Sequence, residues 1–386
     1  MRDDVLIAGA GPAGSLAALL LARAGVRVRL LDRSPFPRAK LCGDTLNPGA
    51  LAVLRRLEAS GGVERVARPV FGMIVSGPGG VQVTGRYPRQ AHGLSVVRRD
   101  LDWHLLSLAI GAGASFDPGV HVRGALVDEH DRVAGVRLST PRGSRDALRA
   151  PLTIAADGRR SSIARGLGLT WHPRRPRRWA VGAYFDRGAS DPVLGEMHIR
   201  PGGYIGVAPV PGGQTNVCLV LSDPSPGQLA QPAVLLRDAL RGDSLLADRF
   251  DRARMVAGPS VLGPLAVDAR AAGAGGLLLA GDAAGFVDPM TGDGLHFALR
   301  GAELAAAVAL AALQGRVRDP AAALLRRRRR AFARKWRLNR ALRALVASPG
   351  AVSLAASAAR LWPPALRALI AAAGDVPRAD RRRARR

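Results

Sequence analysis

A glycine-rich turn near the start of the chain has the residue types and spacing that hold a phosphate. The segment Gly9-Ala10-Gly11-Pro12-Ala13-Gly14 fits the pattern G-x-G-x-x-G. In such a turn Gly9 makes the tight bend, Gly11 lets the backbone approach a pyrophosphate, and Gly14 permits close packing of a helix on a strand. The N-terminus of the following helix offers free N–H groups to negative charge.

The flanking sequence predicts the elements that this turn needs. Residues 4–8 are a short apolar run typical of a buried parallel strand, and residues 13–24 carry leucines and alanines at helical spacing. Residues 26–32 then predict a second strand that ends in Asp32, whose carboxylate can accept hydrogen bonds from a ribose diol. Together these segments predict a βαβ unit that binds a dinucleotide.

Two later strand ends point to a flavin dinucleotide. The segment Thr153–Ser161 ends a predicted strand in Asp157-Gly158, and Leu279–Gly285 ends another in Gly281-Asp282. An aspartate there can bind the ribityl chain of a flavin. The helix opened by Thr291–Leu295 would point its N-terminal amides at the isoalloxazine and stabilise the anionic reduced flavin. The alternative is that each aspartate is only a turn or cap residue.

These three motifs together resemble the large flavoprotein superfamily that includes para-hydroxybenzoate hydroxylase. The segment Pro37–Asp44 resembles the P-x-x-K-x-C-G segment of the geranylgeranyl reductase family, which lies beside the flavin. The resemblance implies FAD as the cofactor and places an arginine, here Arg98, near its phosphates. The motifs and the resemblance give these cofactor-binding positions: Gly9, Gly11, Pro12, Ala13, Gly14, Asp32, Arg33, Lys40, Cys42, Gly43, Arg98, Val122, Asp157, Gly281, Asp282, Pro289, Gly292, Gly294 and Leu295.

The resemblance also implies an activity. It predicts an FAD-dependent oxidoreductase that reduces carbon–carbon double bonds of a prenyl lipid, quinone or polycyclic substrate by hydride transfer from flavin N5. The chain has no second G-x-G-x-x-G unit, so electrons would come from transiently docked NAD(P)H or a ferredoxin-like partner. The alternatives are a class A monooxygenase, which hydroxylates or epoxidises through a C4a-hydroperoxide, and a non-catalytic flavin- or lipid-binding protein.

The substrate strand departs from the family. Where relatives often show Gly-Tyr-x-Trp-x-Phe-Pro, this chain has Gly203-Tyr204-Ile205-Gly206-Val207-Ala208-Pro209. Tyr204 and Gly206 share one face of a strand and are the predicted substrate residues. Small residues in place of Trp and Phe would widen the pocket or change its shape. The Trp-x-Trp-x-Ile-Pro element of flavin-dependent halogenases is absent from the chain.

Three polar side chains keep open roles. Cys42 is the candidate catalytic residue, as a thiol that tunes the flavin or donates a proton; the alternative is a small buried hydrophobic residue in a tight loop. Lys40 would meet the FAD phosphates or close a surface ion pair. His296, just past the flavin loop, is expected to pack within its helix rather than react. No histidine spacing suggests a metal site.

The elements predict an α/β fold: a Rossmann-type FAD-binding domain, an inserted β-sheet substrate domain and C-terminal helices. The FAD-binding domain would be discontinuous, in residues 1–68, 95–165 and 270–330. Residues 69–94 and 166–269, with Gly-Gly turns and alternating polarity, would form the substrate domain. Residues 331–386 would supply C-terminal helices and a basic tail.

Composition excludes some partners. The net charge is +27, yet only Lys40 and Lys335 are lysines, and the many arginines are spread along the chain as a genomic bias would spread them. With aromatics at 4%, a base-stacking surface for nucleic acid is not expected. Two cysteines and no apolar run of spanning length favour a cytoplasmic protein. An apolar face beside arginines after residue 340 would contact a membrane surface, or pack on the protein or a second subunit.

Overall fold

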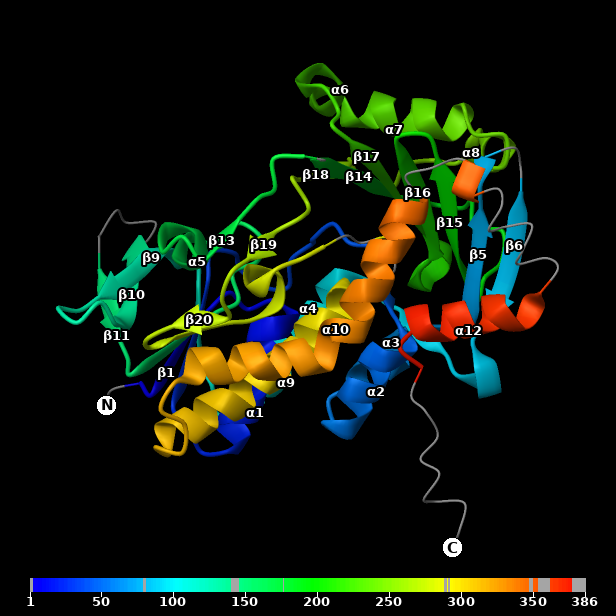
Figure 1. The fold of residues 1–386 in the computed structure, drawn as a ribbon. Coiled ribbons are helices and arrows are strands. Elements are labelled where there is room, and N and C mark those ends of the chain that lie inside the picture. The colour runs from blue at the N-terminus through cyan, green and yellow to red at the C-terminus, as the bar shows by residue number, and fades with distance from the viewer. Residues whose placement is uncertain are drawn as a thin grey trace, which may run out of the picture.

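A mostly parallel sheet, built from strands between residues 5 and 279, forms the centre of one of the two sheet-containing parts of the molecule (Figure 1). The computed structural model describes residues 3–78, 81–139, 146–175, 177–287, 290, 292–346, 350–352 and 362–376. The sheet has the order β20-β21-β12-β1-β2-β8, and β20 alone runs antiparallel to its neighbour. Its strands are β1 (Val5–Ala8), β2 (Val28–Asp32), β8 (Ser115–Pro118), β12 (Leu152–Ala155), β20 (Gly273–Ala274) and β21 (Leu277–Leu279). The predicted βαβ unit and the two later strands are confirmed.

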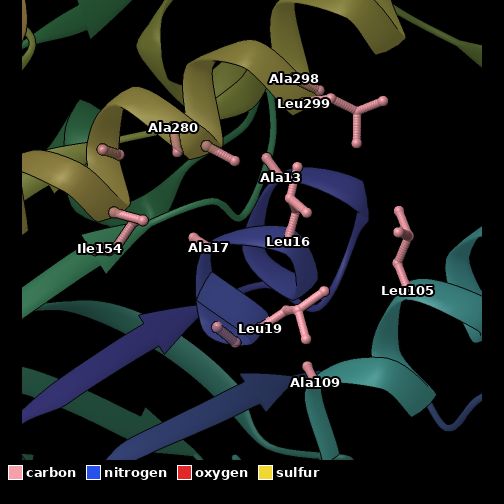
Figure 2. Close-up of a cluster of buried hydrophobic side chains, with 14 of the residues drawn as sticks. Ala13, Leu16, Ala17, Leu19, Leu105, Ala109, Ile154, Ala280, Ala298 and Leu299 are labelled. Atoms are coloured by element: carbon pink, nitrogen blue, oxygen red, sulfur yellow. The ribbon is translucent and has the colours of Figure 1, made fainter. Parts of the chain in front are cut away.

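Three helices cover one face of this sheet. They are α1 (Pro12–Arg23), α4 (Arg98–Gly111) and α9 (Gly294–Leu313). Figure 2 shows Ala13 and Ala17 of α1 turned toward α9, where Ala298 lies, and Leu19 turned toward Ala109 of α4. Small side chains at these contacts let the helices approach closely, which brings α1 and α9, the two helices that begin at the glycine-rich turns, side by side.

Helix α9 is, among the described helices, the one that is long and apolar enough to cross a membrane by length and composition. More than half of its apolar window, 56%, is buried inside the molecule. Leu299, Ala302 and Ala305 are fully buried against α1 and the sheet. The burial is that of a core helix of a folded domain.

The opposite face of the parallel sheet carries a small antiparallel meander. Its strands are β9 (His121–Val127), β10 (Val133–Ser139) and β11 (Ala147–Arg149), and α5 (Ser162–Gly166) packs beside it. The turn between β9 and β10 is closed by a hydrogen bond from the Asp128 amide to the Arg132 carbonyl oxygen.

A second, seven-stranded sheet has the order β18-β14-β17-β16-β15-β5-β6. Two chain segments build it: β5 (Gly72–Ser76) and β6 (Gln82–Arg86) from one, and β14 (Arg178–Phe185), β15 (Leu194–Arg200), β16 (Gly203–Pro209), β17 (Thr215–Ser222) and β18 (Ser260–Leu262) from the other. Its pairs are antiparallel except β5 with β15. Leu236 and Leu240 of α7 (Pro232–Arg241) and Phe250 of α8 (Ala247–Phe250) cover one face, and α6 (Pro226–Ala230) adjoins α7 (Figure 1). The other face turns toward the parallel sheet.

Short elements connect the two sheets. A three-stranded sheet has β7 (Gly93–Ser95) between β3 (Thr45–Leu46) and β4 (Arg68–Val70), next to α2 (Pro48–Arg56) and α3 (Gly61–Val66). A two-stranded ribbon pairs β13 (Thr170–Trp171) with β19 (Asp268–Ala269) where the chain enters and leaves the second sheet. The functional division of the chain into cofactor and substrate parts stays a prediction.

The C-terminal helices differ from the predicted boundary. Helix α10 runs from Pro320 to Val346 without a break and so crosses the predicted limit between residues 330 and 331, which stays a prediction. No glycine or proline lies between Ala321 and Val346, and alanines, leucines and arginines are strong helix formers, so nothing local ends the helix there. Helix α12 (Pro363–Ala373) follows and lies against the edge of the second sheet at β6 (Figure 1).

Candidate functional site

A cavity of about 430 Å³ lies where the two sheets and the C-terminal helices meet. At one end its walls come from the glycine-rich turn and from the loops after β12 and β21. The rest is lined by the second sheet and by α10 and α12. Of the residues predicted for cofactor or substrate, the cavity is lined by Gly11, Pro12, Ala13, Lys40, Cys42, Gly43, Arg98, Tyr204, Gly206, Gly281, Asp282, Gly292, Gly294 and Leu295.

The glycine-rich turn has the geometry of an anion site. Gly9 adopts φ +94°, and a Cβ there would lie 2.5 Å from the Ala156 carbonyl oxygen, so a larger residue is excluded. A Cβ on Gly14 would lie 1.8 Å from the Gly9 carbonyl oxygen. Gly11 differs: its nearest neighbour would be Arg38 Nη2 at 3.8 Å. The space beside Gly11 opens to the cavity, and among the described side chains none caps the N-terminus of α1.

Asp32 braces this turn. Its Oδ2 accepts a 2.9 Å hydrogen bond from the Ala10 amide, and its Oδ1 accepts one of 2.9 Å from the Ser34 amide. Asp32 lies beside the cavity lining rather than in it. A contact with a ribose stays a prediction, and bracing of the turn is a role that the structure itself displays.

Cations gather at the phosphate end of the cavity. Arg98 forms a buried, two-bonded ion pair with Asp102, with N–O distances of 2.7 and 2.8 Å. Burial alone would lower the pKa of Arg98, but the charge of Asp102 outweighs it and raises that pKa. Arg38 Nη1 also approaches Asp102, at 3.4 Å. Two arginine side chains thus share the Asp102 carboxylate and leave positive charge for an anion. Sequence reasoning gave no role to Arg38.

Lys40 joins this group of cations. It lines the cavity and forms no ion pair with a carboxylate in the described part of the chain. Burial of its amine, with the charge of Arg98 next, lowers the pKa of Lys40 to about 8. A phosphate would supply the negative partner that this amine lacks.

Several residues of this site have the geometry and charge that FAD would need. The open Gly11, the uncapped helix and the surplus of cations suit a pyrophosphate. Asp282 lies across the cavity, close enough for its charge to act on Lys40 and Arg159.

Six of the predicted cofactor residues that the structure describes, Asp32 among them, lie outside the cavity lining. Asp157 accepts a 3.0 Å hydrogen bond from the Ser162 amide at the start of α5, and burial raises its pKa. The Val122 side chain packs under the meander, Arg33 is exposed, and Gly14 serves packing. Gly9 shapes the turn from behind. Pro289 lies outside the described residues.

A buried polar cluster beside Cys42 was not foreseen from the sequence. Asp44 is fully buried, and its Oδ2 accepts hydrogen bonds from Tyr184 Oη at 2.5 Å and Asn216 Nδ2 at 2.6 Å. The Arg98 amide donates to Oδ1 at 3.1 Å. Burial raises the pKa of Asp44 to about 6, against the hydrogen bonds from Tyr184 and Asn216, which lower it. A buried, partnered acid one residue from the cavity lining is a group that can exchange a proton near neutral pH.

Both cysteines line the cavity. Burial raises the pKa of the Cys42 thiol, and it raises that of Cys218 to about 12. Neither therefore behaves as a thiolate at neutral pH. Cys218 faces the cavity from β17 beside Tyr204.

Tyr204 and Gly206 lie on the cavity side of β16. Tyr204 packs with Ala180, Val220 and Leu265, and a Cβ on Gly206 would have no neighbour closer than 3.8 Å. The surrounding wall is apolar. It is formed by Met73, Val75, Val83, Met197, Ile199, Leu262, Phe286, Leu342, Leu345, Leu369 and Ile370.

A second unforeseen cluster anchors the C-terminal helices to the cavity. Asp293, at the start of α9, is fully buried and accepts hydrogen bonds from Asn47 Nδ2 at 3.1 Å and Asn339 Nδ2 at 3.0 Å. Lys335 Nζ lies 2.9 Å from it and 2.9 Å from Asp375. The lysine also donates to the last carbonyls of α12, those of Ala372 and Ala373. The scarcity of lysine among 57 basic residues was a signal that could have pointed to it.

Comparison with known proteins agrees with this geometry. Residues 2–337 match the family model described as FAD binding domain. The chain is 33% identical over 321 residues to menaquinone reductase of Mycolicibacterium smegmatis, covering 79% of this chain and 76% of that protein. It is 32% identical over 331 residues to digeranylgeranylglycerophospholipid reductase 2 of Methanopyrus kandleri, covering 81% and 78%.

Solved structures share the fold. A geranylgeranyl bacteriochlorophyll reductase-like protein from Thermoplasma acidophilum superposes with a TM-score of 0.76 at 24% identity, over 90% of this chain and 88% of the other. A flavin-dependent brominase superposes with a TM-score of 0.83 at 18% identity, over 97% and 94%. At these identities the superpositions establish the architecture and leave the substrate open.

Proposed function

The chain belongs to the FAD-binding domain family as an FAD-dependent oxidoreductase of the geranylgeranyl reductase type, and from this premise we propose that it reduces a carbon–carbon double bond in an isoprenoid quinone or prenyl lipid. The bound flavin supplies the hydride. The proposal accords with relatives that are named for the reduction of menaquinone and of a prenylated phospholipid.

The observation that carries the proposal is the change in character along the cavity. Its phosphate end gathers Gly11, Lys40 and Arg98, whereas the part under the second sheet has an apolar wall from Met73 to Ile370. An isoprenoid chain has no polar atoms to satisfy and gains about 25 cal/mol for each Å² that it buries. The site fits a reactant that is apolar where it meets the flavin.

The protein's own residues would orient the substrate and provide a proton. Tyr204, Gly206 and Cys218 form the wall next to Cys42 and Asn216, which in turn contacts Asp44. Reduction of a double bond consumes one hydride and one proton. Asp44, with a pKa raised to about 6 and Tyr184 as hydrogen-bond donor, is the buried acid to which we assign the resupply of this proton.

Delivery of such a substrate would take place at a membrane surface on the cytoplasmic side. Helix α12 lines the cavity with Leu369 and Ile370, and Trp362 before it is 66% exposed. Arg367 on α12 is exposed and Arg343 on α10 is half-buried, and both belong to the helices that line the cavity. Exposed aromatic and basic side chains beside a lipid-lined cavity suit peripheral contact with anionic lipid.

A product analysis tests the proposal against the monooxygenase alternative. Purified protein with FAD is incubated with a chemical reductant and with a polyprenyl quinone in detergent micelles. The mass of the product is then measured by mass spectrometry. A gain of two hydrogen atoms in the isoprenoid chain, beyond the reduction of the quinone ring that the reductant causes without the protein, supports the proposal. A gain of one oxygen atom in air, with no anaerobic product, would establish the monooxygenase instead. Lipid extracted from the freshly purified protein identifies the isoprenoid to use first.

A further inference from the structure

A second pocket lies beside the two-stranded ribbon, on the far side of one chain segment from the flavin cavity. It is lined by Arg165, Trp171, His172, Arg177 and Pro264, with Gly168 and Thr170. Nothing in the proposed reaction uses these residues. They combine an aromatic face with cations, and no carboxylate stands in the lining.

The cations of this pocket are available for an anion. Arg165 and Arg177 are exposed, and within the described part of the chain neither guanidinium pairs with a carboxylate. The side chain of Arg270 also reaches this surface, since a Cβ on Gly168 would lie 3.5 Å from its Nη2. Arginine forks of this kind bind phosphate through paired, charge-assisted hydrogen bonds.

The aromatic and polar side chains of the pocket suit a nucleotide base. Trp171 is a large hydrophobic side chain left 46% exposed at the ribbon, where a stacked ring would cover it. The His172 Nδ1 lies 2.8 Å from the Ala266 carbonyl oxygen, which can only accept, so Nδ1 carries the proton. The neutral ring then presents Nε2 as an acceptor, and this buried atom has no partner among the described residues. An exocyclic amine or carboxamide N–H would satisfy it.

The pocket is next to the flavin cavity. Leu262 and Leu265 line the cavity, whereas Pro264 between them lines the second pocket. The same segment pairs Val267 with Phe286, a cavity residue, through two backbone hydrogen bonds of 2.8 and 2.9 Å. A ligand held at Arg165 and Trp171 therefore needs to pass only this one segment to reach the flavin.

We propose that this pocket holds the adenosine-phosphate half of a reduced nicotinamide dinucleotide, the external electron donor of the enzyme. The assignment rests on the proposed function, because it supplies the reductant which that reaction needs. The dihydronicotinamide ring gives up a hydride and becomes a pyridinium. The oxidised flavin takes up the hydride, with one proton from water, and passes two electrons on to the double bond.

Anaerobic flavin reduction and calorimetry test the site directly. Flavin bleaching is followed over a range of NADPH and, separately, NADH concentrations, and the Kd of NADP⁺ and NAD⁺ is measured by calorimetry. Arg165→Glu/Arg177→Glu should raise the half-saturating donor concentration and the Kd about ten-fold or more, since two phosphate contacts become repulsive. Trp171→Ala should raise both several-fold. Turnover with dithionite should stay unchanged in both variants.

Matched surface variants distinguish an effect of the pocket residues from an effect of the overall charge of the protein. Arg149→Glu/Arg241→Glu removes the same charge from exposed positions elsewhere, and Trp103→Ala removes an equally exposed tryptophan, at 42%. These controls should leave the donor concentration and Kd unchanged. An equal effect of control and pocket variants, or wild-type affinity in the pocket variants, overturns the proposal.

The outcomes also distinguish this inference from the proposed function. Absence of reduction by either nucleotide, with dithionite-driven turnover intact, sinks the pocket assignment and leaves the reductase standing. Reduction only by a reduced acidic ferredoxin, lost in Arg165→Glu/Arg177→Glu, would replace the nucleotide by a protein donor. Failure of the dithionite-reduced enzyme to convert any isoprenoid tells against the proposed function itself.

Discussion

Lys335 on α10 lies 2.9 Å from Asp293, the buried residue that begins α9 at the edge of the cavity. The same amine bonds Asp375 and the end of α12, so one side chain joins the cofactor loop to both helices that wall the cavity. The start of α9 and the end of α12 are thereby linked through a single buried charge.

Loss of the Lys335 amine should destabilise both the start of α9 and the end of α12. Lys335→Met keeps the aliphatic stem but leaves the buried carboxylate of Asp293 and the half-buried carboxylate of Asp375 without their cation. Breaking a buried ion pair in this way costs about 3–5 kcal/mol. We expect a clear fall in Tm and weaker retention of FAD on gel filtration. Arg334→Met, at the exposed neighbouring position on α10, is the control and should behave as wild type. A Tm within experimental error of wild type for Lys335→Met would show that the linkage contributes little.

The phosphate site makes a second prediction. Gly11 has no protein atom within 3.8 Å of its Cβ position, so Gly11→Val should fold, yet the valine would occupy the place where the pyrophosphate approaches. The purified variant should be colourless, with an unchanged circular dichroism spectrum. Gly111→Val, at an open position on α4 distant in sequence from the turn, is the control for the substitution itself. Normal FAD content in Gly11→Val would refute the phosphate assignment.

The buried acid Asp44 gives a pH-dependent prediction. Its folded pKa is raised to about 6 from 3.8, so its protonated form favours folding, and this stability is lost as pH rises between about 4 and about 6. Tyr184 donates to the ionised form, and its removal raises that pKa further. Tyr184→Phe should therefore cost little at pH 4 and about 1.5–3 kcal/mol at pH 8.

Denaturant unfolding at several pH values measures this difference. Tyr87→Phe is the matched control, because Tyr87 is also a buried tyrosine, and its hydroxyl has no hydrogen bond within the described residues. The control should lose the same small amount at every pH. A penalty for Tyr184→Phe that does not grow with pH would mean that Asp44 remains protonated throughout.

The substrate wall makes the fourth prediction. A Cβ on Gly206 has open space around it, so Gly206→Trp should fill the cavity beside Tyr204 without overpacking the sheet. We expect turnover to be lost while Tm and FAD content stay near wild type. Gly124→Trp, at an open strand position on the meander, controls for a bulky substitution. A fall in Tm typical of overpacking, about 1–3 kcal/mol, or full turnover, would remove this strand from the substrate site.

Local patterns were enough to predict the cofactor half of the molecule. The turn from Gly9 to Gly14 and the strand ends at Asp157 and Asp282 are each encoded within about ten consecutive residues, and the fold follows from their order. The type of second sheet also followed from alternating polarity. The unbroken course of helix α10 across residues 330 and 331 was not expected from the sequence, although no residue there ends a helix.

The polar clusters could not be predicted, since their members are far apart in the sequence. Asp44 meets Tyr184 across 140 residues and Asn216 across 172, and Asn47 meets Asp293 across 246. The neighbouring sequence alone would explain each of these residues, as a turn residue, a strand tyrosine or a helix cap. Only the packing of one sheet over the other shows that they share a site.

The most direct test of the central claim is a single anaerobic turnover. Protein reduced with one equivalent of dithionite is mixed in the absence of oxygen with a polyprenyl quinone or prenyl lipid, in deuterated water, and flavin absorbance and product mass are followed together. We expect the flavin to reoxidise as one double bond per flavin becomes saturated, with two deuterium atoms in each saturated bond, because the hydrogen on N5 of the reduced flavin and the added proton both come from solvent. A flavin that stays reduced beside unchanged substrate, and that reoxidises only when oxygen is admitted, would contradict it.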